Sequence, residues 1–395
     1  MSLRNVYIVD FRRVPFSRLT RKEPQRDIYY GMRPEEVAAI VVKDLIERNG
    51  IKPEDIDDLI TGMALQTGEG FLYGGRHVVF AAKLPVTIPA AAVDRQCASS
   101  ITSVVMGANE IATGMADVVI AGGVEHMSKV PMYDNPHVIL NPKFFTDEYA
   151  FYELNVGYVM GLTAERLAEE SKITREEMDR WSLRSHQLAY KALQDGYFKG
   201  EIIPVEVEQE GKKTVVDRDL SIRPDTSLEK LAALPPAFKA DGVITAGNSS
   251  PLNTGAAYLL LMSERAVKKY GLQPMARFVS YGFAGVPPAV MGKGPVPASK
   301  KALERAGLKV RDIDLWEINE AFAVVTLYAI KELGIEEDRV NKRGGAIAIG
   351  HPLGATGARI IGTLARQLQI EGKDRGVATL CVGGGQGAAV VIERV

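Results

Sequence analysis

Short apolar runs alternate along the chain with segments whose apolar residues recur at helical spacing. The runs Val6–Val9 and Val118–Ala121 predict buried strands. Residues 34–49 predict a helix, because a proline and two acidic residues open the segment and Gly50 ends it. Ala98–Thr113 predicts a second helix with one apolar face. This alternation predicts an α/β protein with a largely parallel sheet in each half.

Two segments of the chain repeat each other. Residues 43–57 and 300–314 align at one constant offset, and in both a helical pattern ends at a glycine and leads into a strand. Such a repeat predicts two similar halves, which we place at 1–273 and 274–395. Residues from about 122 to 251 carry prolines, aromatic clusters and charged helical runs, and they predict a loop domain inserted into the first half that shapes a binding site.

Composition and charge narrow the classes of function. The 395 residues include 48 Lys and Arg and 49 Asp and Glu, for a net charge of -1. That balance argues against nucleic acid or an anionic membrane as a partner. Two cysteines are too few for a disulfide framework or a cysteine-based zinc site, so we expect a reducing compartment and no metal. We find neither a membrane-spanning run nor a signal peptide, and we expect a cytoplasmic protein.

Each of the two cysteines lies at the end of a predicted element, where backbone N–H groups are available to a thiolate or a ligand. Cys97 stands just ahead of the predicted helix Ala98–Thr113, where unpaired N–H groups and the helix dipole stabilise a thiolate. A buried cysteine that packs as a small hydrophobic residue is the alternative. Cys381 ends an apolar run and leads into a turn of consecutive glycines, whose backbone N–H groups can approach a ligand closely. A structural strand cysteine is the alternative there.

One histidine is framed as a catalytic base. His351 lies between Gly350 and Pro352, ahead of a helix rich in small residues, which predicts a rigidly held imidazole. Asn319 and Glu320 are polar residues between apolar runs, where Glu320 suits a helix cap and Asn319 needs a buried partner. A cysteine with a positioned histidine indicates nucleophilic acyl transfer through a thioester. The second cysteine indicates more than hydrolysis, which needs only one thiol.

Motifs along the whole chain resemble those of the thiolase family. The resembling segments are VDRQCASS (93–100), GGVEHMS (122–128), MGLTAE (160–165), AGNSSPL (246–252), MGKGPVPA (291–298), NEAFA (319–323), GGAIAIGHPLGATGAR (344–359) and CVGGGQG (381–387). The resemblance implies two α/β halves stacked as five layers, αβαβα, with a loop domain in the first half. It also implies a dimer or a tetramer that uses coenzyme A and acetyl-CoA as substrates and holds no cofactor permanently.

The same resemblance implies a role for each catalytic residue. His351 takes the proton of Cys97, and Cys97 attacks a thioester to form an acyl-enzyme. Cys381 moves a proton at the α-carbon of acetyl-CoA. Asn319 is expected to hold a water that forms one oxyanion hole with His351, and the N–H groups of Cys97 and Gly383 form the other. By position in matching motifs, four further residues resemble contacts to the coenzyme and the thioester: Arg223, Ser250, Phe238 and Met291.

The chain departs from the family pattern at a few places. Ser100, Asp94 and Thr254 stand where the family usually has Gly, Asn and Asp, and none of these changes removes a catalytic side chain. Val159 stands where short-chain acetoacetyl-CoA thiolases typically have His. An apolar wall there favours longer 3-oxoacyl chains, as in fatty acid β-oxidation, so we expect a 3-ketoacyl-CoA thiolase.

Three alternatives remain open on the sequence. A short-chain acetoacetyl-CoA thiolase, that is an acetyl-CoA acetyltransferase, would carry out the same reaction on a smaller substrate. A ketoacyl synthase shares the nucleophile but normally has a second histidine in place of Asn319 and lacks Cys381. A catalytically silent CoA-binding or lipid-binding protein on a thiolase-like scaffold would tolerate loss of the catalytic side chains, and these are all present.

Overall fold

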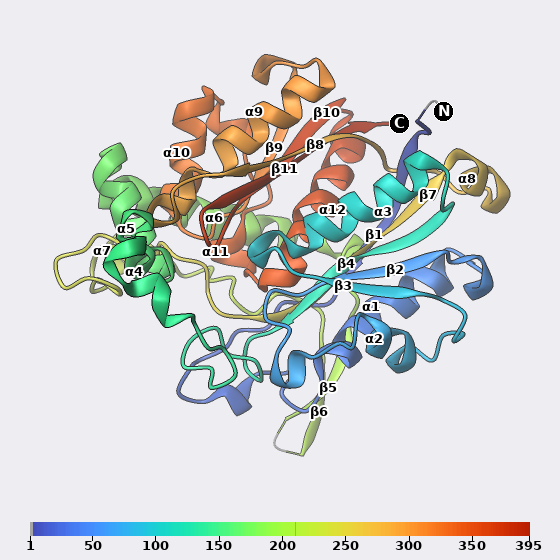
Figure 1. The fold of residues 1–395 in the computed structure, drawn as a ribbon, viewed down its shortest axis with the longest axis horizontal. Coiled ribbons are helices and arrows are strands. Elements are labelled where there is room, and N and C mark those ends of the chain that lie inside the picture. Colours follow the sequence, from blue (N-terminus) through green and yellow to red (C-terminus); the bar gives the residue numbers. More distant parts are fainter. Residues whose placement is uncertain (1–2, 210) are drawn as a thin grey trace.

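A nine-stranded mixed sheet runs through the computed structural model, which describes residues 3–209 and 211–395 (Figure 1). Its strand order is β3-β2-β4-β7-β1-β8-β11-β10-β9. The strands are β1 (Val6–Arg13), β2 (Asp58–Gly62), β3 (Ala90–Val93), β4 (Val118–His126), β7 (Thr254–Ser263), β8 (Ala276–Gly285), β9 (Leu315–Ile318), β10 (Arg375–Val382) and β11 (Gln386–Arg394). Each half of the chain supplies one side of this sheet, and β1 and β8 join the two sides through three residue pairs.

The expectation of largely parallel sheets is wrong. Parallel pairing is confined to β2 with β3 and β4, and to β9 with β10, whereas the other pairs are antiparallel. For β10 and β11 the reason is the short connection: only Gly383–Gly385 separate them, and a turn that short joins strands in antiparallel order. The other antiparallel pairs join strands that are distant in the chain, such as β1 with β7, and the alternation of elements along the sequence does not indicate which strands meet.

Helices form three layers around the two sides of the sheet. The main helices are α1 (Pro34–Arg48), α2 (Arg76–Ala81), α3 (Ser99–Thr113), α8 (Glu264–Tyr270), α9 (Pro295–Ala306), α10 (Ala323–Leu333), α11 (Ala346–Ile349) and α12 (Leu353–Glu371). In Figure 1, α3 and α12 lie side by side between the strands of the two halves, and both helices contact strands from both. Helices α1 and α2 cover the outer face of the first half, and α9 and α10 that of the second. The αβαβα arrangement implied by the resemblance is therefore present.

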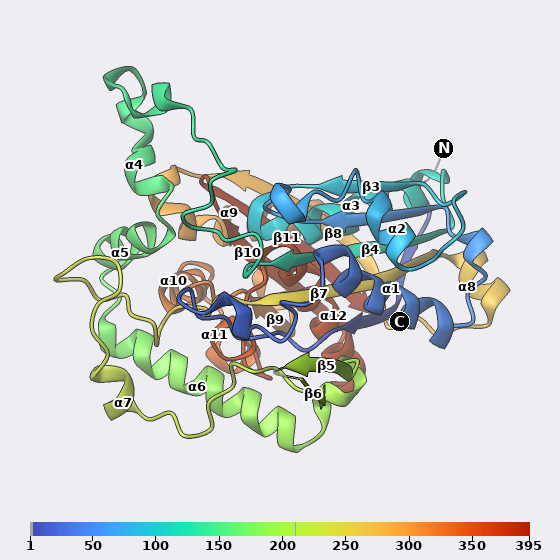
Figure 2. The same ribbon diagram turned by 90° about the horizontal axis from the view of Figure 1, so that it is seen from below.

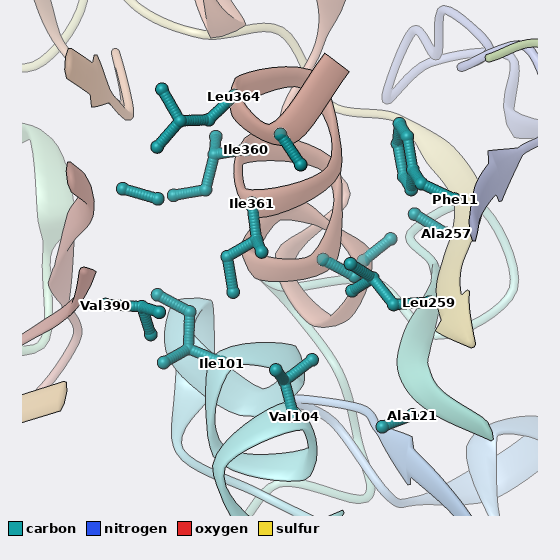
Figure 3. Packing of buried hydrophobic residues seen from close by; sticks show 14 of the residues in the cluster. Phe11, Ile101, Val104, Ala121, Ala257, Leu259, Ile360, Ile361, Leu364 and Val390 are labelled. Carbon is teal, nitrogen blue, oxygen red and sulfur yellow. The ribbon is translucent and has the colours of Figure 1, made fainter. Parts of the chain in front are cut away.

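Buried aliphatic side chains fill the central layer. Figure 3 shows Ile361 of α12 above Ile101 and Val104 of α3, with Val390 of β11 on one side and Leu259 of β7 on the other. All five side chains are fully buried. Because this layer belongs to both halves, it fixes the start of α3 relative to the start of α12.

The sequence repeat corresponds to a structural repeat. Gly50 after α1 and Gly307 after α9 both have positive φ, 62° and 67°, which favours glycine at the end of a helix. Asp57 Oδ2 accepts the N–H groups of Asp117 and Val118 at the start of β4 (2.7 and 3.0 Å). Asp314 accepts those of residues 374 and 375 at the start of β10 in the same way (both 3.0 Å). The identical aspartates thus perform the same task in each half.

The insertion consists of helices and one small hairpin. It contains α4 (Leu154–Gly157), α5 (Met160–Ser171), α6 (Arg175–Gln194), β5 (Val205–Gln209), β6 (Lys212–Val216) and α7 (Leu228–Ala232). Figure 2 shows α4 projecting from the body of the molecule and α6 lying across the second half. The limits 122–251 of the loop domain, and the division at 273, stay predictions. Throughout the described residues, the helices are too short or too polar to cross a membrane.

Candidate active site

Cys97 lies in a single 3-10 turn, Gln96–Ala98, that leads directly into α3. The preceding Gln96 has a φ of 45°, in the left-handed region that residues other than glycine rarely adopt. Two side chains hold this turn: Asp94 Oδ1 accepts the N–H of Gln96 (2.6 Å), and Ser99 Oγ donates to the carbonyl of Gln96 (2.6 Å). A locally strained turn that presents one side chain is typical of a functional site.

The thiol of Cys97 is buried, with 7% of the residue exposed. Burial raises the pKa of Cys97 to about 12, and the N–H of Gly383 lowers it by less than burial raises it. In the free protein this desolvation outweighs the backbone N–H groups, which include that of Gly383 at the sulfur, and the stabilisation of a thiolate by the helix start stays a prediction.

Cys381 lies near the end of β10, opposite Gly387 of β11, and is fully buried. Burial is the main cause that raises the pKa of this thiol, and the nearby charge of Cys97 raises it further. The two thiols therefore lie in one site, and ionisation of Cys97 opposes ionisation of Cys381. Gly384 and Gly385 both have a φ of 82°, so the turn that positions the N–H of Gly383 requires glycine at these two places.

His351 is held in one tautomer by the first turn of α12. The hydroxyl of Thr356 donates to the carbonyl of Pro352 (2.9 Å), so at its contact with His351 Nδ1 (2.7 Å) the imidazole is the donor. Nε2 then carries a free lone pair. Burial, followed by the charge of Arg359, lowers the pKa of His351 to about 3, which keeps the ring neutral.

Asn319 lies one residue beyond β9 and faces His351. Its Nδ2 donates to His351 Nε2 at 3.4 Å, a long contact. Among the described residues, the buried Asn319 Oδ1 finds no hydrogen-bond partner. Asn319 Oδ1 and the unprotonated His351 Nε2 are both acceptors, so together they fit a hydrogen-bond donor such as a water. Asn319 and Gly383 follow the parallel pair β9 and β10, so their strands deliver them to the same edge of the sheet.

The four residues assigned to coenzyme A fall into two groups. Arg223 is exposed and lines a pocket together with His186 and Ser249 of the insertion and Arg18, which follows β1. The N–H of Ser250 donates to the carbonyl of Ala321 (2.9 Å), two residues beyond Asn319.

The second group lies between the insertion and the second half. Met291 is buried there, and the ring of Phe238 packs on Gly161, where a Cβ would overlap it. The same ring meets Phe322 edge-on at 6.1 Å between centroids, and Phe322 lies three residues beyond Asn319. The motifs therefore converge in space, although none of these four residues contacts a catalytic side chain through a described hydrogen bond.

Glu320 differs from the helix cap suggested by its sequence. It is a buried carboxylate that accepts hydrogen bonds from Trp181 and Ser185 of α6 (3.0 and 2.7 Å), and from Asn341 and the N–H of Ile347 (2.9 and 3.2 Å). It therefore fastens the insertion to the loop that carries Asn319.

The three departures from the family pattern all make defined contacts. Asp94 supports the turn before Cys97, as described above. Ser100 Oγ accepts the N–H of Ala358 in α12 (2.9 Å), and Thr254 Oγ1 donates to Asp27 (2.5 Å). Ser100 thus links α3 to α12 rather than merely crowding the backbone.

Sequence reasoning missed three residues that support the site. Thr356 fixes the tautomer of His351, Asn253 Oδ1 accepts the N–H of His351 (2.8 Å), and Glu125 accepts the N–H of Gly354 (2.8 Å). Glu125 carried a signal, since it is a charged residue at the end of a long apolar strand. Asn253 and Thr356 gave no such signal. The partner of Asn253 is distant in sequence, and the contact of Thr356 depends on the direction of its side chain.

Comparisons with known proteins cover the whole chain. Residues 6–265 match the family model for the N-terminal domain of thiolase, and residues 272–394 match that for the C-terminal domain. The 3-ketoacyl-CoA thiolase of Marinobacter nauticus is 43% identical over 399 residues, which cover 99% of each chain. That of Bacillus subtilis is 43% identical over 371 residues, covering 92% of this chain and 93% of the relative.

Solved structures agree with these relatives. Human mitochondrial 3-ketoacyl-CoA thiolase superposes with a TM-score of 0.89 at 37% identity, and 100% of each chain is covered. The acetyl-CoA acetyltransferase of Bacillus anthracis gives 0.88 at 38% identity over 100% of each chain. A further structure of the human enzyme is a complex with CoA; it gives 0.88 at 37% identity, covering 100% of this chain and 99% of that one.

Proposed function

The chain belongs to the thiolase family, and from this premise we propose that Cys97, His351, Cys381 and Asn319 carry acyl transfer between coenzyme A thioesters. In the cleaving direction, 3-oxoacyl-CoA and CoA give acyl-CoA and acetyl-CoA, and the reverse is a Claisen condensation. The observation that carries the assignment is the contact of Asn319 with His351, whose tautomer leaves Nε2 able to accept a proton, together with the N–H of Gly383 at the sulfur of Cys97.

The first step transfers a proton and forms a covalent bond. His351 Nε2 takes the proton of Cys97 as the sulfur attacks C3 of the 3-oxoacyl-CoA. Because the pKa of the thiol is raised and that of the imidazole is lowered, the ion pair is unfavourable in the free protein. The substrate oxygen must therefore be stabilised as the bond forms. Asn319 with His351, and the N–H groups of Cys97 and Gly383, supply the two sets of donors, each donor contributing ~2.7–4 kcal/mol.

The second step breaks the bond between C2 and C3. The electron pair goes to the α-carbon of the departing acetyl-CoA, and Cys381 donates its proton there. The negative charge of an ionised Cys97 raises the pKa of Cys381, so this thiol keeps its proton while Cys97 is ionised. The two thiols can therefore take different roles, one as nucleophile and the other as acid. In the third step the Cys381 thiolate takes the proton of CoA, whose sulfur displaces Cys97 from the acyl group. Cys97 then recovers its proton from His351.

Coenzyme A enters as a substrate, and no permanently bound cofactor is required for this chemistry. Arg223 on the insertion and Arg18 after β1 provide positive charge for the phosphates of the coenzyme, and the backbone of Ser250 leads from their shared pocket toward Asn319. Phe238 and Met291 provide apolar surface toward the thioester end.

Longer 3-oxoacyl chains are the substrates that we propose. Val159 is the N-cap residue of α5. The next residue, Met160, approaches Gly383: its sulfur lies 3.7 Å from the point where a Cβ would stand on that glycine. An apolar side chain there offers no polar contact to a short acetoacetyl group. Steady-state kcat/KM across 3-oxoacyl-CoA chain lengths tests this: a maximum at acetoacetyl-CoA would favour the acetyl-CoA acetyltransferase alternative.

Covalent labelling tests the core of the proposal. After mixing with acetyl-CoA, mass spectrometry should find one acetyl group on the peptide that contains Cys97, and none in Cys97→Ser, because a hydroxyl is a far weaker nucleophile than a thiolate at neutral pH. A silent CoA-binding protein would bind acetyl-CoA and gain no label. Binding of CoA should persist in Cys97→Ser, which separates loss of chemistry from loss of folding.

Assembly and location follow from the same premise. We propose a homodimer or homotetramer, because β3 is a terminal strand of the sheet and exposed apolar side chains surround it: Phe71, Tyr73, Phe80 and Val86. Sedimentation at micromolar concentration should give twice or four times the mass of the chain.

We also propose a cytoplasmic location, supported by two unpaired cysteines whose thiols must stay reduced for the reaction.

A further inference from the structure

Glu125 is a buried carboxylate that the mechanism above does not use. It lies near the end of β4 with no exposed surface. Its Oε2 accepts the N–H groups of Ala64 (2.9 Å) and Gly354 (2.8 Å), and its Oε1 accepts that of Leu65 (3.3 Å). Residues 64 and 65 follow β2 in the first half, whereas Gly354 lies in the first turn of α12. One side chain therefore joins the first half to the helix that begins just after His351.

The backbone segments around Glu125 lie so close together that there is no room for side chains at Gly123 and Gly354. A Cβ at Gly123 would lie 2.1 Å from the carbonyl oxygen of Gly354, and a Cβ at Gly354 would lie 2.3 Å from that of Val124 and 2.7 Å from that of Gly62. The three segments thus pack backbone against backbone. Their buried N–H groups need acceptors, since an unpaired one is costly, and the carboxylate of Glu125 supplies them.

Two more side chains from the first half accept N–H groups around the start of α12. Asn253 Oδ1 accepts the N–H of His351 (2.8 Å), and Ser100 Oγ accepts that of Ala358 (2.9 Å). Together with Glu125 they form what we call the α12 clamp, made of Asn253, Glu125 and Ser100. Only Glu125 in this clamp carries a charge, and it holds the middle of the three contacts.

The loop bound by Glu125 also supports the nucleophile. The carbonyl of Ala64 accepts a hydrogen bond from Gln96 Nε2 (3.4 Å), and Gln96 directly precedes Cys97. The charge of Glu125 is also felt at the sulfur, where it contributes to the raised pKa of Cys97. The other groups that act on this thiol are Asp94, which precedes it in the chain, and Cys381 on β10.

Tyr133, in the insertion, is another ionisable group that interacts with Cys97, whose charge raises the pKa of the tyrosine. Substitution at position 125 leaves all of these neighbours in place.

We propose that Glu125 is a positioning residue for acylation: its carboxyl group binds backbone N–H groups on both sides and so holds the His351 turn in place relative to Cys97. The proposal rests on the roles proposed above for His351 and Cys97. It predicts that the reach of the side chain matters more for acylation than its charge, and the two can be separated by substitution.

The test uses three substitutions of Glu125 in the full chain and two rates. Alkylation of Cys97 by iodoacetamide at pH 7.5, located by peptide mass, reports ionisation and needs no CoA chemistry. Acetylation of Cys97 by acetyl-CoA reports the positioned pair. Glu125→Gln keeps an oxygen for Ala64 and Gly354 but loses the charge. We expect acetylation within about tenfold of the original rate, because the oxygen still holds both backbones, and alkylation within about threefold.

Glu125→Ala and Glu125→Asp remove the reach of the side chain. Acetylation should fall about 100-fold or more in both, as expected when a base is displaced by about 1 Å. Alkylation should stay within about threefold of the unchanged protein in both, because it needs Cys97 but not its contact with a positioned His351. If Glu125→Ala does not fold, Glu125→Asp still separates reach from charge.

Asp314→Asn is the matched control. Asp314 also accepts two backbone N–H groups, but at the start of β10, the strand end opposite to Cys381. Neither rate should change there by more than about twofold. Normal acetylation in Glu125→Asp, or acetylation and alkylation that fall together in every variant, would overturn the proposal. If the unchanged protein gains no acetyl group at all, the proposed function fails; if it is acetylated and Glu125→Asp is acetylated equally fast, only the role of Glu125 fails.

Discussion

At the scale of single residues, the two thiols have similar surroundings and different partners. Cys97 lies at the start of α3, beside the N–H of Gly383, whereas Cys381 lies within β10 and is influenced by the charge of Cys97. These contacts support the proposed division between Cys97 as nucleophile and Cys381 as acid.

The first prediction separates the two roles. Cys381→Ala should still gain an acetyl group on Cys97 from acetyl-CoA but should lose thiolytic cleavage by about 10²–10⁴-fold, because no other proton donor is within reach of the α-carbon. Exchange of the α-protons of acetyl-CoA with solvent should stop as well. A merely structural Cys381 would leave cleavage close to normal, and loss of acetylation in a folded variant would contradict the separation of roles.

The second prediction concerns pH. Because burial raises the pKa of Cys97 to about 12, the thiolate is a minor species at every physiological pH. Its fraction, and therefore the rate of alkylation by iodoacetamide, should rise about tenfold per pH unit between pH 6 and 9. Rates measured on the free protein across this range should show no plateau. A plateau below pH 8 would mean that the helix start stabilises the thiolate after all.

At the scale of elements, the start of α12 and the 3-10 turn before α3 hold the site together. Small residues make this possible, because they let helices and strands approach closely. Gly362 of α12 is one of them: a Cβ there would lie 2.0 Å from the ring of Phe11 on β1. Figure 3 shows this ring beside the helix.

The third prediction follows from that contact. Gly362→Ala should destabilise the protein by about 1–3 kcal/mol through overpacking, although alanine favours helices more than glycine does. The shift should appear in thermal unfolding. Combining it with Phe11→Leu should recover part of the loss, because a smaller side chain gives the new methyl group room. An increase in stability for Gly362→Ala alone would show that the ring moves aside at little cost.

At the scale of the whole molecule, one buried ionic cluster connects the insertion to both halves. Arg13 at the end of β1 donates to Asp219 (2.7 and 2.9 Å) and to Glu201 (3.1 Å), both from the insertion, and all three side chains are fully inaccessible. Thr363 of α12 also donates to Glu201 (3.2 Å). The carboxylates raise the pKa of Arg13, against the effect of its burial, so the guanidinium stays charged.

The fourth prediction is that Arg13→Met loosens the insertion. It would leave two buried carboxylates without their cation, which typically costs about 3–5 kcal/mol. We expect a lower midpoint of urea unfolding and earlier proteolytic cleavage within residues 122–251. Arg265→Met, which breaks an exposed pair with Asp117, is the control and should cost at most about 1 kcal/mol. Equal effects of the two substitutions would contradict a special role for the buried cluster.

The sequence by itself determined the local elements and singled out the residues that we propose for the chemistry. Helices such as Pro34–Arg48 and Arg175–Gln194 arise from periodic apolar positions and capping residues that act over a few positions. The repeat predicted two similar halves, and motif resemblance predicted the family, which the comparisons confirm. Each of these signals lies within a short stretch of chain.

Only the tertiary structure decided the strand directions, the protonation of the site and the clamp on α12. Antiparallel pairing depends on which strands meet, and the pKa values of Cys97 and His351 depend on burial by distant segments. Glu125 binds residues 61 positions before it and 229 positions after it. A pattern read along the chain holds no information about such pairs, because desolvation and hydrogen bonding act through space once folding has brought the segments together.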